Sequence, residues 1–378
     1  MSTANLLKGI RIEYHILQSF PVTCLNRDDV GAPKTAFVGG VPRARVSSQC
    51  WKRSMRLSLH EMGYRIGIRT KMLAELIALD CLELSASEDK AQLCGTLIAN
   101  SLTVDTLFFI SKAEVRRLAE YAAEKDFDLP FEKSKKGKGE DAGSNKLTKN
   151  ALPKIRKCLS YAKTAADGLD IALFGRMVAQ DASLNVNGAV SVAHALSTHK
   201  VSNELDFFTA LDDFITMHHE GEEKLPGSSH MGTLEFNSAT YYRYIALDLG
   251  QLWENLGGNE DILSSIEAFT KALYVAVPSA RQTTQTGLCP WDYARILIRK
   301  GQGMQLCFDT PVRCSPGGGW LEPSIKALDE GLARQEHLAG SLYGKISEVT
   351  YGGKENSSID VVLDTLKRTV TQLMEPEV

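Results

Sequence analysis

Residues 10–17, IRIEYHIL, carry the pattern that most restricts the fold of this chain. Apolar side chains recur at every second position, at Ile10, Ile12, Tyr14 and Ile16. This is the period of a β-strand with one apolar face. An extended piece, TAFVGG, follows at residues 35–40.

Residues 47–63, SSQCWKRSMRLSLHEMG, have the period of a helix. Ser47 or Ser48 can cap its N-terminus, and Gly63 can end it. Trp51, Met55 and Met62 are the side chains expected to be buried. The two periods in succession predict an α+β fold.

The remaining residues mix both periods. Strands are expected at 169–178, at 240–249 with Tyr242, Tyr244 and Ala246 on one face, and at 293–301. Helices are expected within 70–125 and at 151–165, 259–276 and 359–374. Residues 199–232 are polar and acidic, which is typical of a projecting segment. The pattern predicts one α+β domain with a helical insertion at 60–160 and an arm near 200–230.

Composition argues against several classes of protein. The eight cysteines form no CxxC pair and the histidines form no HExxH motif, so neither a metal nor another cofactor is expected. No apolar run approaches the ~18 to 20 residues of a membrane span, and the N-terminus lacks a signal-peptide pattern, so a cytoplasmic protein without membrane contact is expected. GxSxG and Walker motifs are absent, and the isolated GGG at 317–319 is a weak signal.

The charge distribution is more informative than the net charge of -3. From Arg27 to Arg56 there are seven Lys or Arg against two Asp, and from Lys133 to Lys157 nine against two acids. Binding depends on local potential, so these basic zones indicate contact with nucleic-acid phosphates.

The first basic zone has helical geometry. Four polar side chains recur at i, i+3, i+4 and i+7 and share one helix face: Gln49, Lys52, Arg53 and Arg56. Basic side chains that precede this helix are expected beside its N-terminus: Arg27, Lys34, Arg43 and Arg45. A helix N-terminus attracts anions, so the group predicts a phosphate cradle. The alternative is a solvated basic helix face.

Other candidates are less specific. The lysine-rich segment 133–157 either samples duplex DNA through charge or is only solvated. Met177 and Phe208 lie beside polar residues and are either stacking platforms for bases or core residues. Asp28 and Asp29 either hold a metal for phosphodiester cleavage or order a loop, and no third acid has motif-like spacing.

Several ordered blocks together resemble one known family. They are CLNRDD, RVSSQ with KRSMR, DIALFGRM, AHALSTHKV, DFFTALDD, HMGTLEF and YYRY. The chain thereby resembles CasC, the Cascade backbone subunit of type I-E CRISPR systems. The likeness is collinear from about residue 10 to 255 and continues mainly through ENLGG and VPSARQ.

The resemblance implies a right-hand shape within the α+β class. A modified RRM or ferredoxin-like palm would comprise 1–59, 160–198 and 233–378. Helical fingers would comprise 60–159, and a hairpin thumb 199–232. The implied function is non-catalytic: copies polymerise along CRISPR RNA, pre-order its spacer and support target DNA recognition and R-loop formation in antiviral defence.

The resemblance also implies residue roles. RNA-binding side chains would be Arg27, Lys34, Arg45, Gln49, Lys52, Arg53, Arg56, Met177 and Phe208. Lysines in contact with target DNA would be among Lys133, Lys135, Lys136, Lys138, Lys146 and Lys149.

The implied partners are CRISPR RNA, target DNA, further copies of the chain, and the other Cascade subunits. Those subunits are the large subunit, the small subunit, the five-prime-handle cap subunit and the RNA-processing endonuclease. A separate helicase-nuclease would degrade the DNA. Related backbone subunits of type III systems cleave RNA with an aspartate, which keeps a metal-dependent ribonuclease using Asp28 or Asp29 as the alternative. We expect instead that both residues order the loop that carries Arg27.

Overall fold

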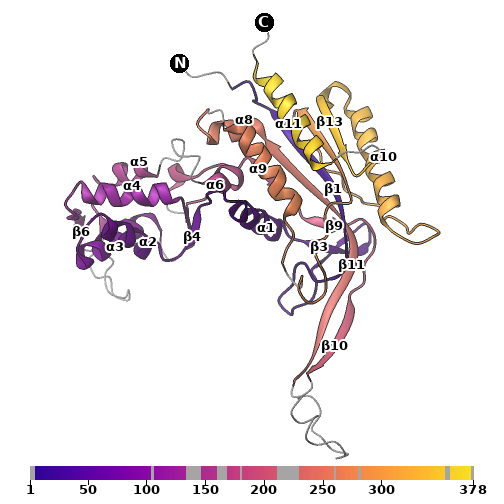
Figure 1. The fold of residues 1–378 in the computed structure, drawn as a ribbon, viewed down its shortest axis with the longest axis horizontal. Helices are drawn as coiled ribbons and strands as arrows, with labels where there is room; N and C mark the ends of the chain where they lie inside the picture. The colour runs from indigo at the N-terminus through magenta and orange to yellow at the C-terminus, as the bar shows by residue number, and fades with distance from the viewer. Residues whose placement is uncertain are drawn as a thin grey trace, which may run out of the picture.

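A computed structural model describes the chain over nine segments. They are residues 5–103, 106–132, 146–159, 168–178, 181–210, 230–258, 261–279, 282–353 and 358–375. The part of the chain that is described combines helices with one large antiparallel sheet, which confirms the predicted α+β class (Figure 1).

The sheet follows the order β13-β12-β1-β11-β9-β3-β2. Its central strands are β1 (Ile10–Thr23), β11 (His230–Asp248) and β12 (Tyr293–Lys300). Its outer strands are β2 (Thr35–Val38), β3 (Val41–Val46), β8 (Val190–Val192), β9 (Ala195–Ser197) and β13 (Lys345–Tyr351). Strand β1 pairs antiparallel with both β11 and β12, and β8 pairs with β11.

The centre of the sheet follows a β-α-β-β-α-β path. The chain runs through β1, helix α1 (Ser48–Glu61), β8 and β9, β11, helix α9 (Ile262–Val275) and β12. In space β12 and β11 flank β1, and β8 and β9 lie on the far side of β11. This connection and order are those of a ferredoxin-like unit.

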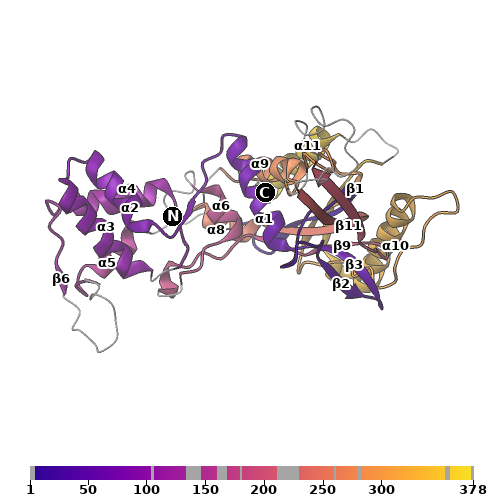
Figure 2. The same cartoon turned by 90° about the horizontal axis from the view of Figure 1, so that it is seen from below.

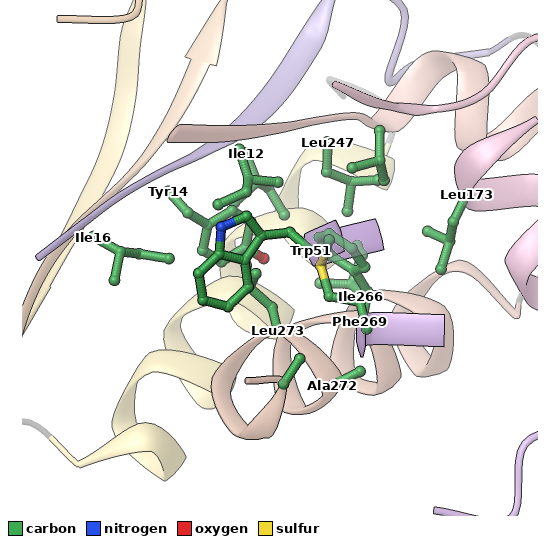
Figure 3. Close-up of a cluster of buried hydrophobic side chains, with 14 of the residues drawn as sticks. Ile12, Tyr14, Ile16, Trp51, Leu173, Leu247, Ile266, Phe269, Ala272 and Leu273 are labelled. Atoms are coloured by element: carbon green, nitrogen blue, oxygen red, sulfur yellow. The ribbon is translucent and has the colours of Figure 1, made fainter. Parts of the chain in front are cut away.

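One face of the sheet is covered by α1, α9 and α11 (Ile359–Met374) (Figure 1). The alternating residues of β1 point into this core, as their period predicted. Trp51 lies between Ile12 and Tyr14 of β1 and Phe269 of α9 (Figure 3). Trp51 is 1% exposed and Met55 is 0% exposed, so α1 buries its apolar side here.

The opposite face is covered by α10 (Leu321–Ala339), which is followed by the short η4 (Gly340–Tyr343). Leu328 and Leu332 of α10 pack with Tyr242, Tyr244 and Ala246 of β11, so the three β11 residues share one face as predicted. Because this cluster covers the sheet, nucleic acid cannot lie directly on the central strands there.

A separate lobe of helices lies beside the sheet (Figure 2). This helical lobe consists of α2 (Leu73–Glu83), α3 (Glu88–Leu102), α4 (Lys112–Ala123) and α5 (Leu152–Cys158). It also contains the strand pairs β4 (Ile68–Thr70) with β5 (Phe108–Ile110), and β6 (Phe131–Glu132) with β7 (Lys146–Leu147). The lobe has its own hydrophobic core. Helix α4 begins with a capping box formed by Ser111 and Glu114.

Strand β10 (Glu204–Ala210) pairs with the first half of β11, and the two strands project from the sheet as an arm (Figure 1). Residues 211–229, where the tip of the predicted thumb falls, lie outside the described residues. Helix α8 (Leu249–Asn255) follows β11 and covers its end.

One element differs in type from the prediction. Residues 169–174, expected in a strand, form helix α6 (Leu169–Phe174), and the short η3 (Ala182–Leu184) follows it. The apolar run is too short for its period to separate a strand from a buried helix. Gly175, with φ of 78°, ends α6. Within the described segments, no helix combines the length and the apolar character that crossing a bilayer requires.

The buried His15 predicts acid-sensitive stability. It is 0% exposed, and its Nδ1 lies 2.9 Å from the Tyr242 hydroxyl. Burial lowers the pKa of His15 below its ordinary value, although the neighbouring Glu13 opposes that shift. Below about pH 6.5 the unfolded chain therefore binds a proton at His15 that the folded chain does not bind. The free energy of unfolding falls as the pH falls below that value.

We expect the melting temperature to fall between pH 7.5 and 5.5, as followed by circular dichroism. H15N should reduce this dependence without abolishing it, because burial also lowers the pKa of His199. H337N, which changes an exposed histidine of α10, should leave the dependence as it is. An equally steep dependence in H15N would contradict the assignment.

Candidate nucleic-acid interface

Backbone hydrogen bonds bring the first basic zone to the N-terminus of α1. The Asn26 side chain accepts from the Ser47 N–H at 3.0 Å, and its carbonyl accepts from the Lys34 N–H at 2.9 Å. The Lys34 carbonyl accepts from the Arg45 N–H at 2.8 Å. Ser47 caps α1 by accepting from the Cys50 N–H. Asn26, which the sequence reasoning missed, therefore joins the loop of Arg27 to α1.

The basic side chains around this N-terminus divide into exposed and buried ones. Arg27 is exposed, and Lys34 and Arg45 are partly exposed. Arg45 donates to the Thr35 carbonyl at 3.2 Å. Arg43 does not belong to the group, which corrects the prediction. It is 1% exposed and donates to the Ser197 and Phe308 carbonyls at 2.7 and 2.9 Å.

The predicted polar face of α1 lies opposite its buried side. Gln49 and Arg53 are exposed, whereas Lys52 and Arg56 are partly buried. The Lys52 ammonium lies 6.0 Å from the centre of the Phe174 ring. The four side chains therefore share a face, but only two of them project freely into solvent.

Arg56 already has an internal partner. Its Nε donates to Asp170 Oδ2 at 2.6 Å, and its Nη2 donates to the Gly67 carbonyl at 2.7 Å. Asp170 is 0% exposed and also accepts from the Gly67 N–H at 2.8 Å. Burial raises the pKa of Asp170 despite the hydrogen bonds from Gly67 and Arg56. Arg56 thus attaches α1 to α6 and to the start of the helical lobe.

Of the two aspartates in the CLNRDD block, Asp28 forms hydrogen bonds within its own loop. Asp28 Oδ1 accepts from the backbone N–H groups of Val30 and Ala32 at 3.0 and 2.9 Å. This arrangement confirms that Asp28 orders the loop carrying Arg27. Asp29 is exposed on the same loop. Among the described residues, no group of three or more His, Cys, Asp or Glu is arranged to hold a metal ion.

Met177 projects from a rigidly held turn. Its side chain is 82% exposed, while the preceding Arg176 is 4% exposed. Arg176 Nη1 lies 2.8 Å from Glu114 Oε1, and the two residues form a fully buried ion pair. Glu114 is also part of the capping box of α4. Met177 is therefore a surface residue rather than part of the core.

Phe208 lies on the arm, where its ring covers Gly232 of the paired strand. A Cβ at Gly232 would come within 2.5 Å of the ring, so the glycine makes room for it. Phe208 is 39% exposed, and the neighbouring Leu205 and Phe207 are 72% and 62% exposed. Sequence reasoning missed these two residues, although the alternation of β10 places them together on the other face.

Four of the predicted DNA-contacting lysines lie outside the described residues: Lys133, Lys135, Lys136 and Lys138. Lys146 pairs with Glu132 in the β6–β7 ladder. Lys149 is exposed just before α5. The assignment of these lysines remains a prediction.

Comparison with known proteins identifies the family. The model of the CT1975-like protein family, a Cas family, matches residues 12–373. A solved structure described as a CRISPR RNA-guided surveillance complex, pre-nicking, contains a chain 25% identical to this one. Its TM-score is 0.77 over 95% of this chain and 99% of that chain.

A second structure, described as a CRISPR RNA-guided surveillance complex, is 22% identical with a TM-score of 0.67. It covers 95% of this chain and 99% of that chain, and it supports the fold alone. No curated protein sequence matches.

The protein has the fold of subunits found in CRISPR surveillance complexes. It belongs to the CT1975-like Cas family. The predicted relationship to CRISPR surveillance complexes is thereby supported, while the narrower assignment to CasC and type I-E remains a prediction.

The different surroundings of Arg53 and Arg56 predict different effects on stability. R56A leaves Asp170 buried without its cation and should lower the free energy of unfolding by about 3–5 kcal/mol. R53A changes an exposed side chain and should alter it by about 0.5 kcal/mol or less. Urea denaturation measures both values. Equal stability of the two variants would show that the Arg56–Asp170 pair does not hold the junction.

Proposed function

We propose that this protein is the CRISPR RNA-binding backbone subunit of a surveillance complex and that its copies polymerise along the guide. The observation that carries the proposal is the structural match over 95% of the chain, together with the family match over residues 12–373. The exposed basic residues at the N-terminus of α1 supply the chemistry.

The binding mechanism is physical. Arg27, Lys34 and Arg45 lie in the segments that hydrogen bonds join to the capped N-terminus of α1, and Arg53 lies on the exposed face of that helix. These groups can neutralise phosphates along one strand. Gln49 adds a hydrogen-bonding side chain on the same face. Such contacts position the backbone and leave the bases free, so sequence recognition falls to base pairing with the target.

Exposed apolar residues complete the proposed RNA site. Met177 projects from its turn and Phe208 from the arm, and both suit contact with bases. In the proposed assembly, the arm of one copy reaches its neighbour and interrupts base stacking at intervals. The spacer is then held near the geometry required for pairing, which lowers the entropy cost of hybridisation.

The narrower parts of the proposal follow from the sequence resemblance. The complex would be a type I-E Cascade, with this chain as CasC acting in antiviral defence. Lysines of the helical lobe would contact target DNA during R-loop formation. The other Cascade subunits would complete the complex, and a separate helicase-nuclease would degrade the target.

The competing function is a metal-dependent ribonuclease that uses Asp28 or Asp29. The contacts of Asp28 with two backbone N–H groups favour a loop-ordering role. We expect D28A to bind RNA about fivefold more weakly, because losing about 1 kcal/mol of loop hydrogen bonding loosens Arg27. Wild type and D28A should both leave bound RNA intact in magnesium. Cleavage by wild type that D28A abolishes would establish the ribonuclease instead.

Salt dependence tests the phosphate contacts directly. The triple variant R27A/R45A/R53A should lower the slope of log Kd against log salt by about 2, because each lost single-strand phosphate contact contributes roughly 0.7. Fluorescence anisotropy with a single-stranded oligoribonucleotide measures this slope. The matched control R334A/R368A changes exposed arginines of α10 and α11 and should keep it. An unchanged slope in the triple variant would contradict the assignment.

The role itself is tested by purifying the tagged protein from cells carrying its own operon and sequencing the RNA bound to it. RNAs of one length with constant ends and variable middles would support a guide-bound assembly. Heterogeneous RNA, or none, would contradict it.

A further inference from the structure

The arm leaves the sheet across a gap between two strand ladders (Figure 1). Strand β9 pairs with β11 as far as Ser197, opposite Tyr241, and β10 resumes the pairing at Glu204, opposite Phe236. Residues 198–203 between these pairs belong to no strand. Strand β11 continues unbroken through this region, so the attachment of the other strand of the arm depends on side chains and on isolated backbone contacts.

The side chain of His199 bridges this gap. The Thr240 N–H of β11 donates to His199 Nε2 at 3.2 Å, and His199 Nδ1 lies 2.9 Å from the Lys200 carbonyl oxygen. A backbone N–H can only donate and a carbonyl can only accept, so Nδ1 carries the proton and Nε2 offers a lone pair. His199 is 2% exposed. The bridge to β11 therefore requires a neutral imidazole in this tautomer.

Trp320 holds the imidazole from the other side. The centres of the His199 and Trp320 rings lie 4.1 Å apart, and the ring planes differ by 12°. Trp320 precedes α10 and follows the three-glycine run, in which Gly318 and Gly319 have φ values of 92° and 91°. Side chains other than glycine rarely adopt this conformation. Ser324 Oγ donates to the Trp320 carbonyl at 2.6 Å. The glycine run thus forms the turn before a residue that packs on the base of the arm.

The charges around His199 oppose its protonation. Burial lowers the pKa of His199, the hydrogen bond to Lys200 opposes that shift, and the charge of Arg43 adds to it. In the described part of the chain, no carboxylate forms an ion pair with His199. Further titratable groups on the elements packed here are Arg45 of β3, Arg243 of β11, Cys307 and Asp309 of the loop after β12, and Glu322 of α10. Asp309 and Cys307 act on Arg43 itself. A proton on His199 would therefore lie near Arg43 without a partner of opposite charge.

We propose that His199 is a positioning residue for the arm: in its neutral form it holds the departing strand to β11, and protonation at Nε2 releases that strand. Protonation removes the lone pair that accepts from Thr240, and it places a charge in a buried site. The consequence for RNA rests on the proposed function, in which apolar residues of the arm contact bases.

The size of the effect follows from linkage. A released imidazole titrates near its ordinary pKa of about 6.5, whereas the held imidazole does not bind the proton. The released form is therefore favoured as the pH falls below that value. Between pH 7.5 and 5.5 the equilibrium constant for release should rise about tenfold.

Hydrogen exchange of the full-length protein without RNA tests the proposal, with peptides that cover residues 199–203 and 236–240. After correction for the intrinsic pH dependence of exchange, protection of these amides should fall about tenfold from pH 7.5 to 5.5, relative to a peptide of α9. H199Q should show the same protection at both pH values, because its amide oxygen can accept from Thr240 and does not titrate. H337Q, which changes an exposed histidine of α10, should respond as wild type does.

Variants of Trp320 test the clamp if H199Q folds poorly. W320F keeps an aromatic ring against the imidazole and should retain most of the protection at pH 7.5, whereas W320A should lose about tenfold. Protection of the wild type that does not change with pH would overturn the proposal. A fall in H199Q equal to that of the wild type, or wild-type protection in W320A, would also overturn it.

A binding measurement separates this proposal from the proposed function. The ratio of the wild-type Kd to the H199Q Kd for a fluorescent oligouridylate should be higher at pH 5.5 than at pH 7.5. An equal ratio would overturn the link to RNA binding. Because exchange is measured without RNA, a wild type that does not bind RNA would overturn the proposed function and leave the role of His199 in holding the arm supported.

Discussion

The packing of Trp51 between β1 and α9 is the constraint on which the rest of the structure depends. It determines which side of α1 is buried and therefore which side carries Gln49 and Arg53 into solvent. The guanidinium carbon of Arg243, on strand β11, lies 3.6 Å from the centre of the Trp51 ring. Burial lowers the pKa of Arg243 to about 9, so a desolvated cation is held here by the ring and by a hydrogen bond to Gln18. These contacts of Trp51 hold α1 in one rotational orientation on the sheet.

Two buried carboxylates then determine how the helical lobe joins the sheet. Asp170 holds Arg56 and the backbone at Gly67, and Glu114 holds Arg176 beside the exposed Met177. Losing one partner of such a pair leaves the other charge buried, which is more costly than losing a surface contact. The surfaces proposed to contact RNA are thus positioned by ion pairs that face the interior.

The covered sheet explains why the proposed RNA site differs from that of an ordinary RRM. RRM domains stack bases on aromatic residues of an open sheet face. Here Leu328 and Leu332 of α10 cover Tyr242 and Tyr244 on that face. The accessible chemistry lies instead along α1, the preceding loop and the arm. In the proposed function, α1 and the loop offer basic groups to phosphates, and the arm offers apolar side chains to bases.

The sequence alone predicted parts of the three central strands, the approximate extent of α1 and the separation of its polar and apolar sides, because periods of 2 and 3.6 record which side of an element is buried. The resemblance to CasC supplied the relationship to surveillance complexes. Only the tertiary structure decided that Arg43 is buried, that Arg56 forms an ion pair with Asp170, and that residues 169–174 form a helix. Partners such as Arg69 and Phe109 come from strands nearly forty residues apart, and local periodicity contains no information about such pairs. Which charged side chains lie beside one another depends on residues that are far apart in the sequence, so it is decided only when the chain folds.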